Sequence, residues 1–257
     1  EVWSKVLERL NQDVPYDIFE DPMKFRVAIA KDPVYGTRSK WRRAWRKIKT
    51  DHLDDSTFWN VVSGMMSAVS HEGVDNTWNI ADVFGELYGT KYLVDSSKDP
   101  LRLYYLSKKH PERLKTLVLI RDVHGVANSG KNRGEPLEEG AQKWLNHYNK
   151  KIKPVIDTLD PSSWMLVRYE DIAQNPGKVR EEIANFIGVE EPGPLPVINP
   201  QVGYHLVAGN KMRYRGEVKF KHDVKWKRQL NEDEIKMLDE VAAQVDPFFR
   251  RIPQTVS

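Results

Sequence analysis

The chain has 257 residues, of which 40% are hydrophobic and 30% are charged, a composition typical of a globular protein. It contains no cysteine, which excludes disulfides, cysteine-ligated zinc and iron–sulfur clusters. The formal net charge of +3 favours an anionic ligand, but we do not expect nucleic acid as a partner. The longest strongly apolar run, Leu117 to Ile120, is too short to span a membrane, and no signal segment opens the chain, so we expect a cytoplasmic protein.

Helical and strand patterns alternate along most of the chain. In chain order they predict helices at 3–10 and 78–88, a strand at 91–94, a helix opening at Pro100, a strand at 115–120, a helix at 123–131, a long helix at 137–159 with Pro154 inside it, a strand at 164–168, and helices at 176–187 and 231–245. Gly89 and Gly188 are expected to close two of these helices, and Asn231 with Glu234 to form a capping box. No Pro/Gly/Ser-rich linker divides the chain, so we expect a single domain over residues 1–257.

The strand at 115–120 is apolar on both sides, as strands in the middle of a parallel sheet are. Strands that alternate with helices also indicate βαβ units. The sequence therefore predicts an α/β fold with three layers, in which helices flank a central parallel sheet.

Polar and charged residues follow each predicted strand, where ligands bind in open parallel sheets. Arg121 and Asp122 end one strand, with Ser129 eight residues after Arg121 and Arg133 four residues after Ser129. A helix over 123–131 would put Ser129 and Arg133 one turn apart on one face. Two guanidinium groups and a hydroxyl suit a phosphate monoester, because guanidinium forks match phosphate oxygens.

Four other segments complete the pattern of candidate site residues. They are Asp95-Ser-Ser-Lys-Asp-Pro100, Tyr169-Glu-Asp171 with Asn175-Pro176, Gly209-Asn-Lys-Met-Arg213, and Asp223-Val-Lys-Trp226-Lys227. Each has a structural alternative. Arg121-Asp122 alone would suit a surface ion pair, Tyr169–Asp171 a helix-capping turn, Asp95 a helix cap and Gly209-Asn210 a turn.

Taken together and in this order, these motifs resemble the P-loop-type sulfotransferases that use the nucleotide PAPS (3′-phosphoadenosine 5′-phosphosulfate), in a branch with many bacterial members. The resemblance covers nearly the whole chain and implies transfer of a sulfuryl group from PAPS to a hydroxyl or amine of a small-molecule or carbohydrate acceptor, with PAP as product and no metal required. It assigns Arg121, Ser129 and Arg133 to the 3′-phosphate, and Tyr169 and Arg213 to the nucleotide site. Lys98, Ser96 and Ser97 are implied near the sulfuryl group or the acceptor. Glu1 is the first candidate for the general base, followed by Asp95 and His124.

The sequence departs from the family pattern in three places. Val123 stands where the family has Pro, and His124 where an Arg is common. The family's opening strand and its loop for the 5′-phosphosulfate do not occur in these residues, and Glu1-Val2-Trp3 resembles a segment that follows that loop. We therefore expect the first strand and the donor loop to precede Glu1.

Two other functions remain open. Residues 125–132 nearly match a Walker A loop, which would make the protein a P-loop kinase or NTPase, although Asn132 stands where Ser or Thr should bind Mg²⁺. Residues 38–49 contain seven Lys or Arg together with Trp41 and Trp45, which would suit a non-catalytic polyanion-binding module or, alternatively, a solvated amphipathic helix. The identity of the acceptor and the oligomeric state stay open.

Overall fold

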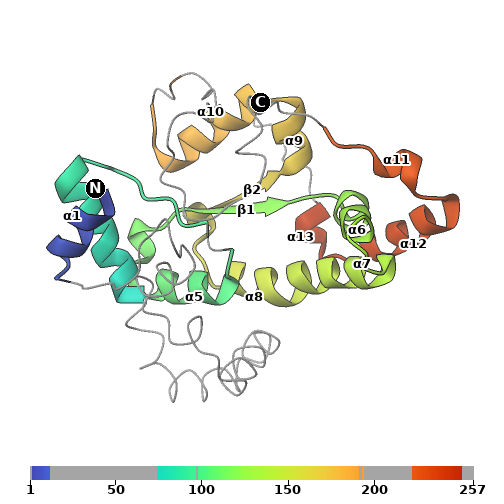
Figure 1. The fold of residues 1–257 in the computed structure, drawn as a ribbon, viewed down its shortest axis with the longest axis horizontal. Helices are drawn as coiled ribbons and strands as arrows, with labels where there is room; N and C mark the ends of the chain where they lie inside the picture. The colour runs from blue at the N-terminus through green and yellow to red at the C-terminus, as the bar shows by residue number, and fades with distance from the viewer. Residues whose placement is uncertain (1, 12–73, 97, 191–192, 194–221, 251–257) are drawn as a thin grey trace, which may run out of the picture. The chain divides into compact units, whose positions relative to one another are not determined.

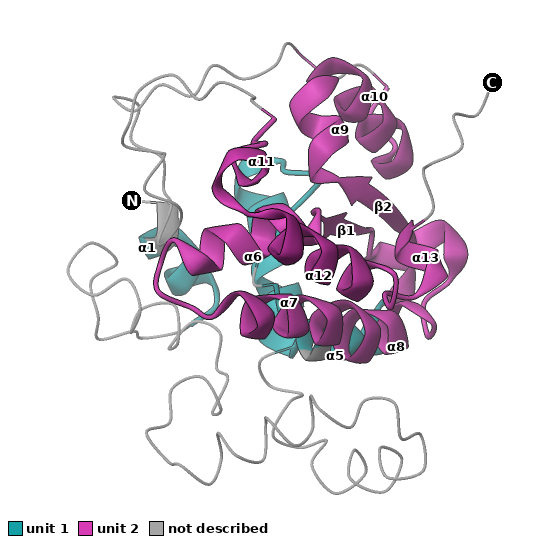
Figure 2. Ribbon diagram, turned by 90° about the vertical axis from the view of Figure 1, so that its right-hand side faces the viewer, with its two compact units in different colours: residues 1–110, 200–214 teal, residues 111–199, 215–257 magenta. Residues whose placement is uncertain are grey.

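The structure is a computed structural model that describes residues 2–11, 74–96, 98–190, 193 and 222–250. The chain divides into two compact units, residues 1–110 with 200–214 and residues 111–199 with 215–257, which Figure 2 shows in two colours. The expectation of one domain over residues 1–257 remains a prediction.

The first unit is helical in its described part. It contains α1 (Val2–Arg9), a helix that includes residues 74–88, and α5 (Pro100–Lys109). Arg9 of α1 forms an ion pair of 3.0 Å with Glu86. Asp75 pairs with Lys109 of α5, so side chains from both ends of the 74–88 helix connect it to its neighbours. Pro100 opens α5 as predicted, since proline suits the first helical position.

The strand predicted at 91–94 does not form, which corrects the sequence interpretation. Residues 91–96 are exposed, and Val94 has an exposed fraction of 86%. A strand must pair its backbone N–H and C=O groups with a neighbouring strand, and no described strand lies against this segment. Apolar composition alone was therefore an insufficient signal at this place.

The second unit is built on two parallel strands, β1 (Thr116–Ile120) and β2 (Trp164–Arg168). Their register runs from Thr116 opposite Trp164 to Ile120 opposite Arg168, so both strands end at the same edge. The predicted strands at 115–120 and 164–168 are thus confirmed. They are joined through helices, as a parallel pair requires.

Helices lie on both sides of this strand pair, which confirms the α/β class with helices flanking a parallel sheet. The expectation that β1 is buried on both faces is wrong, because Leu117 and Leu119 are 44% and 54% exposed. Val118, Ile120 and Leu166 face a core shared with α6 (Val123–Lys131), α7 (Leu137–Asn146) and α12 (Glu232–Ala242). Val167 points to the opposite face because side chains alternate along a strand, and it is also buried. Figures 1 and 2 show α9 (Tyr169–Gln174) and α10 (Pro176–Ile187) on the side of the strands away from α6 and α7.

The long helix predicted at 137–159 is divided into three parts. The structure has α7 up to Asn146, a π-helical segment over His147–Ile152, and α8 (Lys153–Ile156). Pro154 has no backbone N–H to donate to the preceding turn, and a widened turn before it accommodates this loss. Gly188 closes α10 with a φ of 79°, and Asn231 and Glu234 form the predicted capping box of α12.

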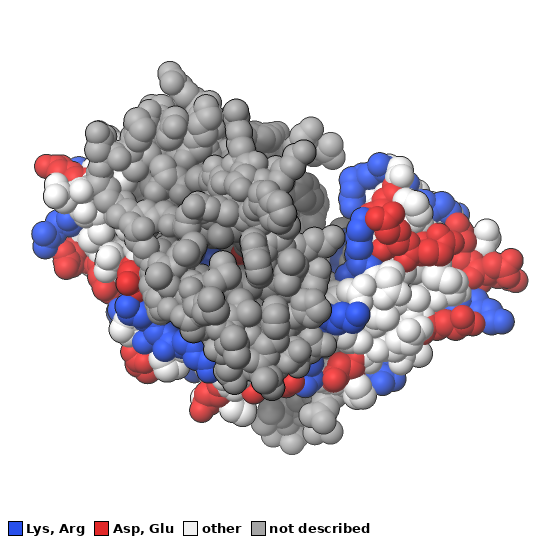
Figure 3. Space-filling model, turned by 90° about the horizontal axis from the view of Figure 1, so that it is seen from below, with Lys and Arg blue, Asp and Glu red and all other residues white. Residues whose placement is uncertain are grey.

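Short helical segments complete the second unit. They are η1 (Pro111–Arg113), η3 (Pro161–Ser163), α11 (Trp226–Gln229) and α13 (Pro247–Arg250). None of the helices in the described part of the chain is long and apolar enough to cross a membrane. On the face that Figure 3 shows, basic and acidic side chains of the described residues are interspersed.

Candidate functional site

Arg121 lies immediately after β1, at the edge where both strands end. Its guanidinium lies over the ring of Tyr169, 4.5 Å from the ring centroid, and its Nη2 atom is 3.4 Å from Oδ2 of Asp223. These contacts leave the Arg121 side chain 27% exposed. The cation is therefore oriented by Tyr169 and Asp223, which come from two distant parts of the chain, before any ligand binds.

Gly125, four residues after Arg121, gives the guanidinium room to lie against α6. A Cβ atom at position 125 would be 2.9 Å from Nη2 of Arg121 and 3.0 Å from its Nε. Real Cβ atoms essentially never come so close to another heavy atom. In the sequence, Gly125 stands out only as the first glycine of the Walker-like pattern. The spacing of four residues from Arg121 was the signal that would have connected the two.

Ser129 and Arg133 form the second half of the candidate site. Nη1 of Arg133 donates to Oγ of Ser129 at 2.8 Å, as their spacing of four residues on one face predicts. Because the hydroxyl oxygen accepts from a guanidinium, its own hydrogen remains to be donated to an anion. Ser129 follows Gly125 by four residues, a rise of about 6 Å along the helix. The Arg121 guanidinium, which lies against Gly125, and the Ser129 hydroxyl are thus about one helical turn apart.

The end of β1 is held firmly by neighbouring polar groups. The Trp144 Nε1–H donates to the Arg121 carbonyl at 2.9 Å, and the Tyr148 hydroxyl donates to the Leu119 carbonyl at 3.1 Å. Burial raises the pKa of Tyr148 to about 12, so this hydroxyl keeps its proton at neutral pH. The backbone N–H of Asp122 donates to Oε1 of Glu170 at 3.0 Å, which connects the ends of the two strands.

His124 is buried between two carboxylates at the start of α6. Its Nδ1 lies 2.7 Å from Oδ1 of Asp122, its Nε2 lies 3.2 Å from Oδ1 of Asp239, and its ring stacks on Trp226 at 4.4 Å. Burial acts to lower the pKa of His124, but the hydrogen bond and negative charge of Asp122 and the charge of Asp239 outweigh it and raise the pKa above its ordinary value. The Asp122 carboxylate also accepts from the His124 backbone N–H and so caps α6.

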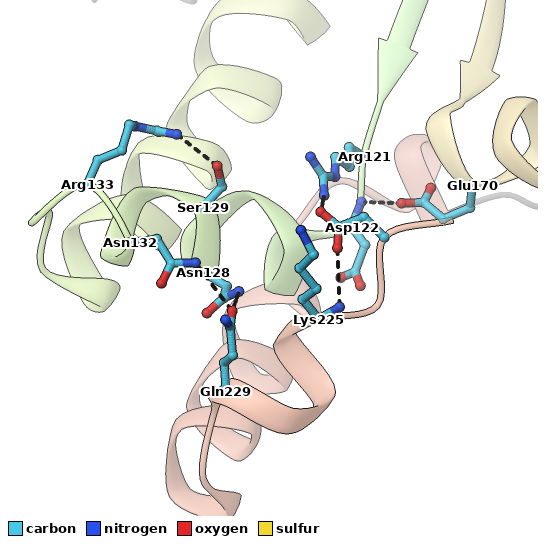
Figure 4. Close-up of polar contacts among 10 residues, drawn as sticks. Arg121, Asp122, Asn128, Ser129, Asn132, Arg133, Glu170, Lys225 and Gln229 are labelled. Atoms are coloured by element: carbon cyan, nitrogen blue, oxygen red, sulfur yellow. Dashed lines mark hydrogen bonds and ion pairs between the residues drawn. The ribbon is translucent and has the colours of Figure 1, made fainter. Parts of the chain in front are cut away.

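The segment before α11 closes the site from the C-terminal part of the chain. Asp223 pairs with Arg121 and also accepts from the Lys225 backbone N–H at 3.2 Å. Figure 4 shows the Lys225 side chain extending on the Arg121 side of this segment. Gln229 accepts from Asn128 of α6 at 2.7 Å, which fixes α11 against α6. The Asp223-x-x-Trp226 element named from the sequence thus lies next to the end of β1.

The Tyr169-Glu170-Asp171 motif forms the first turn of α9 and supports Arg121. Glu170 and Asp171 stand in the first turn of α9, whose N-cap is Arg168 and has no side-chain cap hydrogen bond, so the helix-capping alternative is not confirmed. Asn175 and Pro176 open α10. Tyr169 supports Arg121 with its ring. A role for Tyr169 in the nucleotide site remains a prediction.

The remaining predicted site residues lie either outside the described part of the chain or in the first unit. Glu1, Ser97 and Arg213 lie outside the described residues, as do residues 38–49. Asp95 is exposed and accepts a hydrogen bond from Nε of Arg102 of α5 at 2.8 Å. Lys98 is exposed and has a φ of 60°, a conformation that non-glycine residues rarely adopt. Both belong to the first unit.

The Walker-like segment has the wrong conformation for a phosphate-binding loop. Residues 125–131 lie inside α6, whereas a Walker A motif needs a loop between strand and helix. Lys131 forms an ion pair of 2.5 Å with Glu234 of α12. A Cβ atom at Gly130 would be 2.5 Å from Oε2 of Glu135, so this glycine accommodates a carboxylate from the same chain. Packing accounts for both glycines of the pattern.

No protein-family model matches the sequence. Among solved structures, the chain is similar to the sulfotransferase domain from the curacin biosynthetic pathway, with 16% sequence identity and a TM-score of 0.41 over 94% of this chain and 85% of that one.

Proposed function

We propose that the protein is a PAPS-dependent sulfotransferase and that the end of β1 binds the 3′-phosphate of the nucleotide. One observation carries the proposal. Arg121, held by Tyr169 and Asp223, and Ser129, held by Arg133, lie about one helical turn apart beside the edge where parallel strands end.

The chemistry of these residues fits a phosphate monoester. Among the described contacts of Arg121, the ion pair with Asp223 involves only Nη2 of the guanidinium. The Ser129 hydroxyl has a hydrogen to donate. Charge-assisted hydrogen bonds of this kind are roughly twice as strong as neutral ones. Lys225 adds positive charge on the Arg121 side of the segment before α11.

When bound, PAPS supplies a sulfuryl group, which passes to the acceptor oxygen or nitrogen as its bond to the 5′-phosphate breaks. A general base of this chain takes the acceptor proton, with Glu1 and then Asp95 as the proposed candidates. Lys98 and the Ser96 and Ser97 hydroxyls are proposed to donate to the sulfuryl group or to the acceptor. His124 is a poor candidate for the base because Asp122 and Asp239 keep its imidazole engaged and its pKa raised.

Isothermal calorimetry with two nucleotides tests the proposal. We expect 3′,5′-ADP to bind more tightly than 5′-AMP by at least roughly tenfold to a hundredfold, because removal of the 3′-phosphate loses at least one charge-assisted contact, which costs about 1.5–3 kcal/mol. Equal affinities for the two nucleotides would exclude a 3′-phosphate site. Salt-sensitive binding of heparin without any nucleotide preference would instead support the polyanion-binding module.

A further inference from the structure

The Arg121 guanidinium lies directly against Gly125 of α6. Three atoms of the guanidinium, Nη2, Nε and Cζ, would lie 2.9, 3.0 and 3.3 Å from a Cβ at position 125. The guanidinium therefore lies with one side along the backbone of α6. The Tyr169 ring and the Asp223 carboxylate contact the same group.

We propose that Gly125 is a positioning residue that sets the selectivity of the site for nucleotides carrying a 3′-phosphate. By lacking a side chain, it allows the Arg121 guanidinium to lie across the first turn of α6, in line with Ser129. This inference rests on the proposed function, because it concerns the same phosphate.

Helix stability does not account for a glycine at this place. Position 125 is inside α6, where glycine is a poorer helix former than alanine. Gly125 is buried, yet the three nearest atoms to a Cβ there all belong to the Arg121 side chain. A methyl group at 125 would therefore leave the helix intact and move Arg121.

The displacement would break the alignment on which phosphate binding depends. Arg121 cannot retreat far in one direction, because the Tyr169 ring lies 4.5 Å from its Cζ atom. A shift along the helix or away from it separates the guanidinium from the turn that carries Ser129. Both donors would then no longer reach one phosphate group. Binding of the rest of the nucleotide does not involve Gly125 and would remain.

The test is the ratio of the affinities for 3′,5′-ADP and 5′-AMP in Gly125→Ala, measured by calorimetry. We expect the ratio to fall about tenfold, approaching the loss caused by Arg121→Ala, while the affinity for 5′-AMP changes by less than about twofold. Gly177→Ala is the matched control, since a Cβ at this helical glycine of α10 would have nothing within 4 Å. We expect no change of the ratio in this variant.

A double-mutant cycle shows whether Gly125 acts through Arg121. In an Arg121→Ala background, Gly125→Ala should have no further effect on 3′,5′-ADP affinity. Thermal unfolding of each variant separates positioning from stability, because we expect Gly125→Ala to unfold no earlier than the wild type.

The outcomes distinguish the inference from the function on which it rests. A wild type without preference for 3′,5′-ADP would remove the proposed function itself. A wild type with that preference, combined with an unchanged ratio in Gly125→Ala or an equal further loss in the Arg121→Ala background, would overturn only the role of Gly125. A lower unfolding temperature of Gly125→Ala with an unchanged affinity ratio would show that Gly125 serves packing, and would likewise overturn its role in positioning Arg121.

Discussion

Arg121 and Lys98 both follow an apolar run that the sequence predicts as a strand, yet the structure treats the two places differently. Before Arg121, β1 is paired in register with β2, and Val118 and Ile120 are buried. Before Lys98, residues 91–94 pair with no described strand, and Val94 is 86% exposed. Arg121 is contacted by groups from α9 and from the segment before α11, whereas Asp95, near Lys98, pairs with a side chain of the adjacent α5.

The difference shows which residues that follow a strand become part of a binding site. A paired strand fixes the direction in which the chain leaves the sheet, and packed neighbours then fix the side chain. Such groups lose little entropy on binding, so their contacts contribute more to affinity. We therefore expect the 3′-phosphate side of the proposed site to be organised in advance around Arg121.

The largest expected effect separates these two places directly. Arg121→Ala should weaken 3′,5′-ADP binding roughly tenfold to a hundredfold, for loss of about 1.5–3 kcal/mol in a charge-assisted contact. Lys98→Ala should change it by less than about threefold, because 3′,5′-ADP lacks the sulfuryl group that Lys98 is proposed to contact. Calorimetry on both variants provides the measurement. A loss on Lys98→Ala comparable to that on Arg121→Ala would refute the division of roles.

A smaller effect distinguishes two residues on α6 itself. Ser129→Ala should weaken 3′,5′-ADP binding about tenfold, corresponding to about 1.4 kcal/mol for one hydrogen bond to a charged group. Lys131→Ala should change it by less than about threefold, because Lys131 is engaged with Glu234 and is partly exposed.

The reverse result would return the segment to the NTPase interpretation. Loss of binding with Lys131→Ala, no effect of Ser129→Ala, and Mg²⁺-dependent ATP binding would together indicate a Walker-type site. Titrations with and without EDTA make that distinction.

The smallest expected effect is a pH dependence of the free energy of unfolding that comes from His124, three residues after Arg121. The pKa of His124 is raised in the folded protein, so the stabilisation of its charged form by Asp122 and Asp239 is fully present below about pH 6.5, the ordinary value. It is lost as the pH rises through the folded-state pKa. The free energy of unfolding should therefore differ more between wild type and His124→Gln at pH 5.5 than at pH 8.5.

Urea denaturation at the two pH values measures this difference. His147, whose pKa burial and Lys151 lower, titrates in the opposite sense but is present in both proteins and cancels. The other histidines are likewise present in both proteins, so the difference reports on His124 at the start of α6. An equal or larger difference at pH 8.5 would mean that the imidazole is not held as a cation by its two carboxylates.

Local pattern was sufficient for most elements of the second unit. The bounds of α6, β2 and α10 were predicted from apolar periodicity, from Pro176 and from Gly188, because these signals act within a few residues. The contact between Ser129 and Arg133 was predictable for the same reason, since helix geometry brings residues four apart together.

Only the tertiary structure decided which of these signals became parts of one site. Residues 91–94 have strand-like composition, but a strand depends on a partner that composition does not specify. The role of Gly125 depends on where a guanidinium comes to lie, and the pairing of Arg121 with Asp223 joins residues 102 positions apart. His124, named as a candidate base, is instead held between Asp122 and Asp239, because folding places α12 next to the start of α6. The sequence by itself thus determined most of the longer helices, the strands β1 and β2 and the short-range pairs on them, but not the short helices α9, α11 and α13. Long-range packing decided which charged groups were oriented for a ligand and which were paired with each other, because this depends on distances between segments far apart in the chain.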